Sequence, residues 1–524
     1  MNRETGELTI YQRYNRDTFF GSFFPARFPL AILPLLIPLA PLALHGEDQL
    51  SSTPQTSSYF QEPRPSRASN PPVQNSELKA LREELGKLRK KVQQLEEDYG
   101  QKEESPEGKK QASKPPLVID AKGIRLQSPD GSSWLRIGGL LQVDNRTLTA
   151  PDDGSSFVLR RVRPDLRGTL WDHYEFRIMP EFGQVGTLFS GRQIALYYAY
   201  LNVHYWDEFQ VRAGKFKSPL GLERLEDAEW RPFVDVGFPT ELVPTRIVGI
   251  EAHGELVDKI VEWRLGAYNG AADFQVGSNI DFDTSREFAG RLLVHPLQPL
   301  QPRGLNDLAL AFGFSHGTEK TANLLPSGYV TPAERIFFRY RSDAFADGDH
   351  TRFNPGGYLS AGPFFFLSEY VVSRQAVSRP SLPLAEDVQN EAWGVQGVYT
   401  LTGEPFTYKD GLTPKHPFHP WTAEGGWGAW QLVARYDELW IDPDAFQGGK
   451  LSLADPDTNG RWAKAWRVGL NWYWDQNVKV MFQFAHTDFD RDVLLGIPTG
   501  TGTANASRKT QTENAFLMRW QLRF

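Results

Sequence analysis

One short string in the chain has the spacing of a serine hydrolase. Residues 313–317 read Gly-Phe-Ser-His-Gly, the G-x-S-x-G pattern that holds a nucleophilic serine on a tight turn between a strand and a helix. Strand-like alternation leads into the string, and a loop-like GTEKT stretch begins at its last residue, so the required helix is missing. We therefore expect Ser315 to be structural and keep hydrolysis as the least favoured of the functions considered.

The chain also contains one incomplete metal motif. Asp455, Asp457 and Asn459, followed by Gly460, copy the start of an EF-hand calcium loop, but the twelfth position is Trp466 where a bidentate Glu is needed. We therefore expect a polar turn there. The ten histidines form no H-E-x-x-H motif, and the lack of cysteine excludes disulfides, thiolate metal sites and cysteine nucleophiles. The sequence predicts no metal and no other cofactor.

Composition favours strands and excludes a nucleic-acid binder. The chain has 524 residues, with 34 Phe, 18 Tyr, 15 Trp and 46 Gly, a mixture that suits strands and turns better than helices. Its formal net charge is −7, and its Lys and Arg residues are not gathered into one long run. A nucleic-acid binder needs a concentrated basic surface, so we set that class aside.

The chain before residue 117 divides into four segments. Residues 1–46 are predicted to be a signal peptide, because their apolar run is uncharged, rich in Pro and too short to span a membrane. Residues 47–75 are a Pro- and Ser-rich disordered linker, and residues 99–116 form a second linker. Between them, residues 76–98 are predicted to be an α-helical coiled coil. Its heptad seam consists of Leu78, Leu81, Leu85, Leu88, Val92 and Leu95.

From residue 117 to residue 524 the apolar period is two, as in strands. The last strand shows it best. One of its faces is apolar and ends on an aromatic residue, and the other is polar. The apolar face consists of Phe516, Met518, Trp520, Leu522 and Phe524. A strand of an outer-membrane barrel needs this pattern, because it meets hydrocarbon outside and water inside. Polar stretches such as residues 342–354 and 442–460 are predicted to be loops. We predict an all-β transmembrane barrel over residues 117–524.

Six strings in this region resemble the phosphate-selective porin O and P family. They are Val211–Arg224, Arg246–Gly254, Gly266–Gly270, Gly290–Pro296, Tyr399–Glu404 and Gly469–Tyr473. The resemblance covers roughly residues 130–524. It implies an outer-membrane barrel of about 16 antiparallel strands, usually a homotrimer, through which small hydrophilic solutes diffuse. A signal peptide and a coiled coil before the barrel resemble the longer members of that family, which implies a coiled coil in the periplasm.

The resemblance also implies where selectivity would arise, because rows of basic side chains line the lumen in that family and one loop folds inward. By strand parity, the pore-lining candidates are Arg136, Arg161, Arg163, Arg167, Arg177, Arg212 and Arg264. The candidate constriction loop is the segment 215–246. Its basic residues are Lys215, Lys217, Arg224, Arg231 and Arg246. Six acidic residues stand among them, so composition alone does not predict an anion trap. An equal alternative is that inward arginines merely solvate a wet lumen and pair with inward acids such as Asp165, Glu175, Glu251 and Glu262.

We predict a passive outer-membrane porin for small hydrophilic solutes, including anions such as phosphate. Its expected partners are outer-membrane lipid, further copies of the chain in a homotrimer, and the solutes. The first alternative is an outer-membrane anchor whose coiled coil binds the cell-wall polymer, and a barrel hydrolase is the second. Deletion of residues 76–98 would separate porin from anchor, because conductance should survive while envelope attachment should fail.

Overall fold

The computed structural model describes residues 117–149, 154–183, 194–280, 285–300, 307–321, 324–421, 425–496 and 509–524, and also 86, 87, 90 and 91. The chain divides into two compact units, Met1–Glu107 and Gly108–Phe524, and the barrel belongs to the second. The predicted signal peptide, linkers and coiled coil lie outside the described residues, except that 86, 87, 90 and 91 are helical. Among the described residues, no helix is long and apolar enough to cross a membrane.

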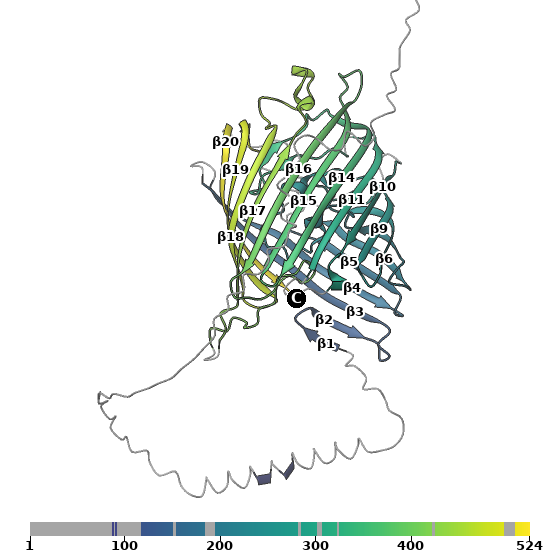
Figure 1. Ribbon diagram of the computed structural model, residues 1–524, viewed down its shortest axis with the longest axis vertical. Helices are drawn as coiled ribbons and strands as arrows, with labels where there is room; N and C mark the ends of the chain where they lie inside the picture. The colour runs from purple at the N-terminus through teal and green to yellow at the C-terminus, as the bar shows by residue number, and fades with distance from the viewer. Residues whose placement is uncertain are drawn as a thin grey trace, which may run out of the picture. The chain divides into compact units, whose positions relative to one another are not determined.

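The strands form a closed antiparallel barrel (Figure 1). The described part of the chain has an 18-stranded sheet, and sixteen of these strands form a ring because β20 pairs with β3. The ring strands are β3 (Trp134–Leu148), β4 (Ser155–Leu170), β5 (Tyr174–Glu181), β6 (Ala195–His204), β7 (Gln210–Phe216), β8 (Ile247–Leu256), β9 (Val261–Tyr268), β10 (Glu287–Val294), β11 (Asp307–Glu319), β14 (Phe345–Ala361), β15 (Phe364–Ser378), β16 (Glu386–Thr400), β17 (Ala429–Trp440), β18 (Trp462–Tyr473), β19 (Val478–Leu494) and β20 (Lys509–Arg523). The 16-stranded barrel implied by the family resemblance is confirmed.

The other two strands form a hairpin that prolongs the barrel wall. In it, β1 (Leu117–Asp120) pairs with β2 (Gly123–Gln127), and β2 pairs with the first residues of β3. Phe524 pairs with Gly139 of β3, so β2 continues along β3 where the C-terminal strand stops. Gly138 is required at this junction, because a Cβ there would lie 2.6 Å from the carbonyl oxygen of Phe524.

The outward face of the wall carries an apolar band between two aromatic girdles. On β17 and β18 the outward residue Trp440 pairs with Trp462 near one rim, and Trp430 pairs with Trp472 near the periplasmic rim. Leu432 and Leu470 pair between them. Ten residues separate the two tryptophans of β17. At about 3.3 Å per residue and a tilt of about 40°, they stand about 25 Å apart across the membrane, the height of the apolar band of such barrels.

Short and long connections lie at opposite ends of the barrel. Residues 171–173, 257–260, 362–363 and 474–477 are short turns at the end that holds both Trp134 and Phe524. In outer-membrane barrels this end faces the periplasm. The longer connections, such as 217–246 and 441–461, lie at the other end. Two connections at the periplasmic end are longer, those between β10 and β11 and between β16 and β17, and we call the described residues of the second, 401–421 and 425–428, the long periplasmic turn.

One sequence prediction about loops is wrong. Residues 442–460 are a loop, with η6 (Pro443–Phe446) and η7 (Gly449–Leu451), but residues 342–354 are not, because β14 begins at Phe345. The inward side chains of β14 include His350, Arg352 and Asn354, which are buried and polar. Because the inward side chains of β14 are polar like its neighbouring residues, the strand lacks the alternation of apolar and polar residues from which a strand can be predicted.

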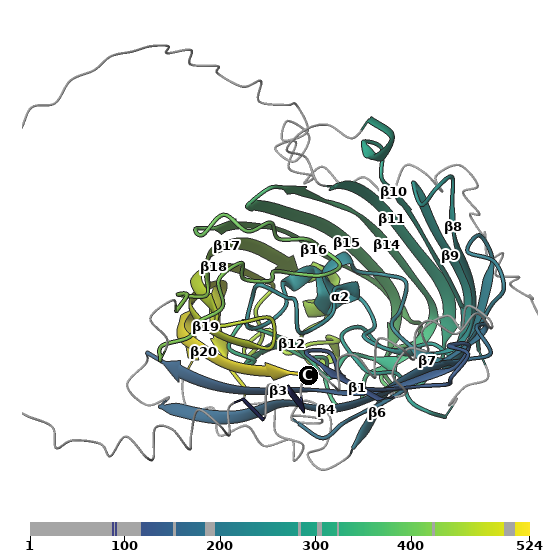
Figure 2. The same ribbon diagram turned by 90° about the horizontal axis from the view of Figure 1, so that it is seen from below.

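Two loops fold into the barrel. Residues 217–246 contain α2 (Leu222–Leu225) and η3 (Phe238–Leu242), and residues 324–344 contain β12 (Tyr329–Val330) and β13 (Ile336–Phe338). Figure 2, seen from below, shows α2 and β12 inside the ring of strands. We call these segments the first and second inner loops. Their apolar side chains pack with inward residues of β15 to β19, such as Val388, in one hydrophobic core. That side of the barrel is therefore filled.

Candidate functional site

The first inner loop crosses the lumen and is hydrogen-bonded to the opposite wall. The backbone N–H groups of Leu222 and Glu223 donate to the carboxylate of Glu369 on β15, at 2.6 and 2.9 Å. A helix as short as α2 cannot satisfy its first N–H groups internally, so the wall carboxylate accepts them. Further along, the N–H of Phe238 donates to Asp437 of β17 at 2.9 Å. The loop is thereby fixed at several points.

A buried ion pair strengthens the same attachment. Glu223 of the first inner loop pairs with Arg435 of β17, and its other oxygen accepts the N–H of Gly237 at 2.8 Å. Burial opposes ionisation of this carboxyl, but Arg435 and nearby Arg231 outweigh burial and keep the pKa of Glu223 below its usual value. Breaking such a pair would leave an uncompensated buried charge, so the pair holds the loop in one position.

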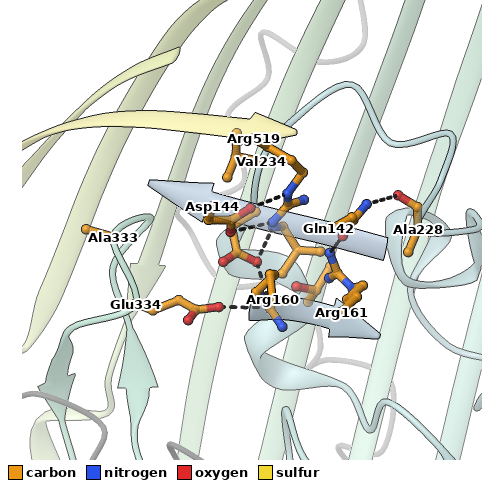
Figure 3. A network of polar contacts seen from close by, with 12 residues as sticks. Gln142, Asp144, Arg160, Arg161, Ala228, Val234, Ala333, Glu334 and Arg519 are labelled. Atoms are coloured by element: carbon orange, nitrogen blue, oxygen red, sulfur yellow. Dashed lines mark hydrogen bonds and ion pairs between the residues drawn. The ribbon is translucent and has the colours of Figure 1, made fainter. Parts of the chain in front are cut away.

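Both inner loops are also tied to the seam where β20 meets β3 (Figure 3). Arg519 of β20 donates to both oxygens of Asp144 on β3, at 2.6 and 2.8 Å. Arg160 of β4 reaches Asp235 of the first inner loop at 3.4 Å and Glu334 of the second at 2.8 Å. Positive and negative charges alternate through this cluster, which is buried. The seam therefore holds both loops inside the barrel.

A cavity remains on the other side of the lumen, between the first inner loop and the wall. Its volume is about 230 Å³. The wall supplies guanidinium groups from β5, β7, β9 and β10, and the loop supplies Lys217, Glu226 and Asp227. The arginines are Arg177, Arg212, Arg264 and Arg291. The long periplasmic turn contributes Tyr408 and Lys409, and Lys409 pairs with Glu262 of β9 at 2.5 Å. Strands, inner loop and turn therefore meet around this cavity.

Three of these four arginines keep unused hydrogen-bond donors. The guanidinium groups of Arg212 and Arg264 share the buried Glu251, each at 3.9 Å, and Arg291 lies 3.7 Å from Glu262. None of the three donates a hydrogen bond to any residue in the described ranges. A guanidinium with free donors is a good receptor for a planar or tetrahedral oxyanion. The cavity therefore offers sites for anionic groups of a solute.

The remaining pore-lining candidates are mostly engaged by the protein. Arg177 donates to both oxygens of Asp165 at 2.8 and 2.9 Å, Arg163 pairs with Glu181, and Arg161 donates to Gln142. The guanidinium groups of these three arginines are therefore bonded to other side chains of the barrel wall. Strand parity places such residues on the inner face but cannot tell which of them acquire a partner.

A row of arginines leads from the periplasmic end toward the cavity. In the strand register Arg125 of β2 lies opposite Arg136, Arg136 opposite Arg167, and Arg167 opposite Arg177. Like charges directly opposite one another are destabilising in a sheet. Asp120 lies 3.9 Å from Arg136, and Asp165 lies 3.8 Å from Arg167 and pairs with Arg177 at 2.8 Å, so the charge of the row is only partly offset. Such a row is tolerable where water can reach it.

Only one constriction-loop candidate lines the cavity, namely Lys217, which pairs with Asp227 at 2.6 Å. The other four bind backbone or loop groups. Lys215 donates to Gly277 and Asn279, Arg224 to Thr240, Arg231 to Arg224 and Glu226, and Arg246 to Thr245. Arg291 and Lys409 also line the cavity and are not among the residues predicted from the sequence. Alternation along β10 marks Arg291 as inward, whereas nothing in the sequence shows that the long turn bends into the barrel.

Ser315 is not held on a nucleophile elbow. It lies within β11, fully buried, with its hydroxyl unpaired. Ser373, His350 and Glu319 do have the spacing of a catalytic triad, at 2.8 and 2.9 Å. However, both the serine and the histidine are buried, and the hydroxyl of Ser373 donates to Asp273 at 2.7 Å, so this cluster braces the wall.

The incomplete calcium motif forms a turn. Asp455 accepts the N–H of Asp457 at 3.1 Å and lies 3.7 Å from Arg341. Within the described ranges, no group of three or more His, Asp or Glu side chains could hold a metal ion.

Comparison with known proteins identifies the family. The profile of the phosphate-selective porin O and P family matches residues 136–524. Among solved structures, the anion-selective porin from Comamonas acidovorans aligns at 10% identity over 75% of this chain and 100% of its own, with a TM-score of 0.45. The outer-membrane channel DcaP of Acinetobacter baumannii aligns at 10% identity over 76% and 99%, with a TM-score of 0.46.

The outer-membrane protein OmpT of Vibrio cholerae aligns at 13% identity over 75% of this chain and 98% of its own, with a TM-score of 0.44. No curated protein sequence matches the chain. Because the family profile covers well over half of the residues, including nearly all of the barrel, the chain belongs to the phosphate-selective porin O and P family and is an outer-membrane porin.

Proposed function

We propose that this porin passes small hydrophilic solutes along one side of its barrel and prefers anions. The observation that carries the proposal is the set of unused guanidinium donors of Arg212, Arg264 and Arg291 at the cavity. The hydrophobic core around the inner loops fills the side formed by β15 to β19, so the route runs past these arginines. Phosphate fits the preference, because its oxygens accept the paired N–H groups of a guanidinium.

Acidic side chains limit the strength of that preference. Glu226, Asp227 and Glu262 also line the cavity, and Asp227 and Glu262 neutralise the two lysines there. The excess positive charge comes from the wall arginines, whose attraction acts over a short range in salt. We therefore propose moderate anion selectivity with a weak phosphate site, in which the nearest side chains matter more than the net charge of the chain.

Single-channel recording in a planar bilayer tests the proposal. Purified protein should give discrete conductance steps that added phosphate partly blocks. In a salt gradient, the sign of the reversal potential should show that anions are more permeant than cations. A reversal potential whose sign shows cation preference would contradict the proposed anion selectivity but not the proposed channel. If no conductance steps appear, the proposed transport function is wrong, and the role as an outer-membrane anchor becomes the favoured function.

We also propose a plan for the segments that precede the barrel. Residues 1–46 direct export, residues 76–98 form a periplasmic coiled coil that assembles a homotrimer, and the porin domain covers residues 117–524. The unbroken apolar heptad seam supports self-association, and the hairpin that begins at Leu117 supports this start of the domain. Deletion of residues 76–98 tests the plan by the mass of the detergent-solubilised assembly. Loss of envelope attachment with an intact trimer would instead favour the cell-wall tether.

A further inference from the structure

The long periplasmic turn has two arms, and they lie on opposite faces of the barrel wall. On the inner arm, Phe406 and Leu412 are buried inside the barrel, and the hydroxyl of Tyr408 donates to the carbonyl of Leu222 in the first inner loop at 2.5 Å. On the outer arm, the N–H of Phe418 donates to the carbonyl of Trp474 at 2.6 Å. The turn therefore straddles the periplasmic rim.

Aromatic contacts fix the outer arm against the lipid-facing side of the wall. The ring of Phe418 lies 4.8 Å from the ring of Trp472 and 5.5 Å from that of Trp474. Trp472 is an outward residue of β18, stacked at 5.0 Å on Trp430 of β17. These two tryptophans belong to the aromatic girdle near the periplasmic rim. The outer arm therefore lies at the height of the interface between lipid and water.

Two tryptophans of the outer arm have largely exposed side chains. The side chain of Trp421 is 93% exposed and that of Trp427 is 76% exposed. The indole N–H of Trp472 donates to the backbone carbonyl of Trp427 at 2.8 Å, so the backbone is fixed at the girdle while the ring projects away from it. Large apolar rings held outward at this height are unfavourable in water and favourable among lipid headgroups, where indole has one apolar and one polar side.

We propose that the outer arm, residues 416–421 and 425–428, docks onto the phospholipid surface of the periplasmic leaflet through Trp421 and Trp427. The occupant is the headgroup and glycerol layer, because the arm is hydrogen-bonded at girdle height to strands whose next outward residues are apolar. Docking lies outside the transport route. It would hold the outer arm of the same turn whose inner arm lines the cavity with Lys409.

Depth-dependent quenching tests the docking. The chain has no cysteine, so Trp421→Cys and Trp427→Cys each give one labelling site for an environment-sensitive fluorophore in the full-length protein. Asp410→Cys, an exposed position on the inner arm, is the matched control on the same turn. Lys450→Cys, exposed in a loop at the opposite end, is the aqueous control. All four positions are exposed, so folding should survive and can be checked by heat-dependent migration in gels.

In vesicles of phosphatidylethanolamine and phosphatidylglycerol, labels at positions 421 and 427 should emit at shorter wavelength than the two controls. A spin-labelled headgroup quencher should reduce their emission severalfold more than a quencher placed deep in the acyl chains. Emission and quenching equal to those of the Asp410→Cys label would overturn the proposal. Short-wavelength emission without quenching by either lipid would also overturn it, since a second copy of the chain would then cover the arm.

Discussion

Removal of one wall charge should shift ion selectivity by an amount that the geometry of the passage sets. Arg264→Gln is the most informative change, because its guanidinium lines the cavity and donates no hydrogen bond to the described protein. Its closest acidic neighbour, Glu251, also lies 3.9 Å from Arg212, so it keeps a cationic partner after the substitution. The change therefore removes charge from the route without dismantling an ion pair that holds the fold.

The expected size follows from Coulomb's law. A unit charge about 5 Å from an ion contributes about 0.8 kcal/mol at the dielectric constant of water, and more where the lumen is poorly hydrated. Removing it destabilises an anion and stabilises a cation, so the ratio of their permeabilities changes by twice this energy. Screening in about 0.1 M salt, where the Debye length is about 10 Å, reduces the total to about 1 kcal/mol, or roughly fivefold in the permeability ratio.

Reversal potentials under a potassium chloride gradient measure this ratio directly. Arg374→Gln is the matched control, because it removes the same charge from the outer side of the wall, where Arg374 pairs with Asp387 at 2.7 Å. Its permeability ratio should stay close to that of the unchanged protein. Equal shifts for the two variants would show that the whole charge distribution sets selectivity, and no shift for Arg264→Gln would show that ions do not pass these arginines.

Three further outcomes are expected. Burial raises the pKa of Glu226 to about 8, so this carboxyl is neutral below that pH and charged above it. Anion preference should therefore fall as the pH rises through about 8, and reversal potentials of Glu226→Gln should lack this step. Leu242→Ala, which opens a cavity in the core around the inner loops, should lower the free energy of unfolding in detergent by about 2–5 kcal/mol, whereas Leu432→Ala on the outer face should change it little. Gly411→Ala should raise single-channel conductance, because φ is +62° there and a Cβ would lie 2.3 Å from the ring of Trp230, forcing turn and inner loop apart.

The sequence predicts the wall of this porin much better than its interior. Alternation along a strand is a local property, so the inward arginines, the outward aromatic residues and the terminal Phe524 can all be placed from neighbouring residues. A β-bulge interrupts the alternation between inward and outward side chains. The register of β3 and β4 shifts between Gln142 and Val143, and next to this shift Arg160, of opposite parity to Arg161, reaches Asp235. Parity counted along an unbroken strand would have placed Arg160 outside.

The interior depends on contacts between residues far apart in the chain. Arg161 and Arg212 are alike in sequence, both inward and both on the wall. Their hydrogen bonding differs, because the side-chain oxygen of Gln142 on the neighbouring strand accepts a hydrogen bond from Arg161. Arg212 instead lies 3.9 Å from a carboxylate that it shares with Arg264, and 4.8 Å from the ring of Tyr200. Which guanidinium stays unpaired is decided by the register between strands and by the path of the inner loops, and neither can be read from the spacing of residues.

The packing of the inner loops also argues against a swinging gate. Leu242 of the first inner loop and Phe338 of the second are fully buried in one core with Val388 of the wall. Releasing either loop would expose this core and separate the buried pair of Glu223 and Arg435, at a cost comparable to unfolding a small domain. The position of the constriction is therefore a property of the folded state. Selectivity should change through side chains at the cavity or through the long periplasmic turn, whose exposed Lys409 lines the cavity and pairs with Glu262.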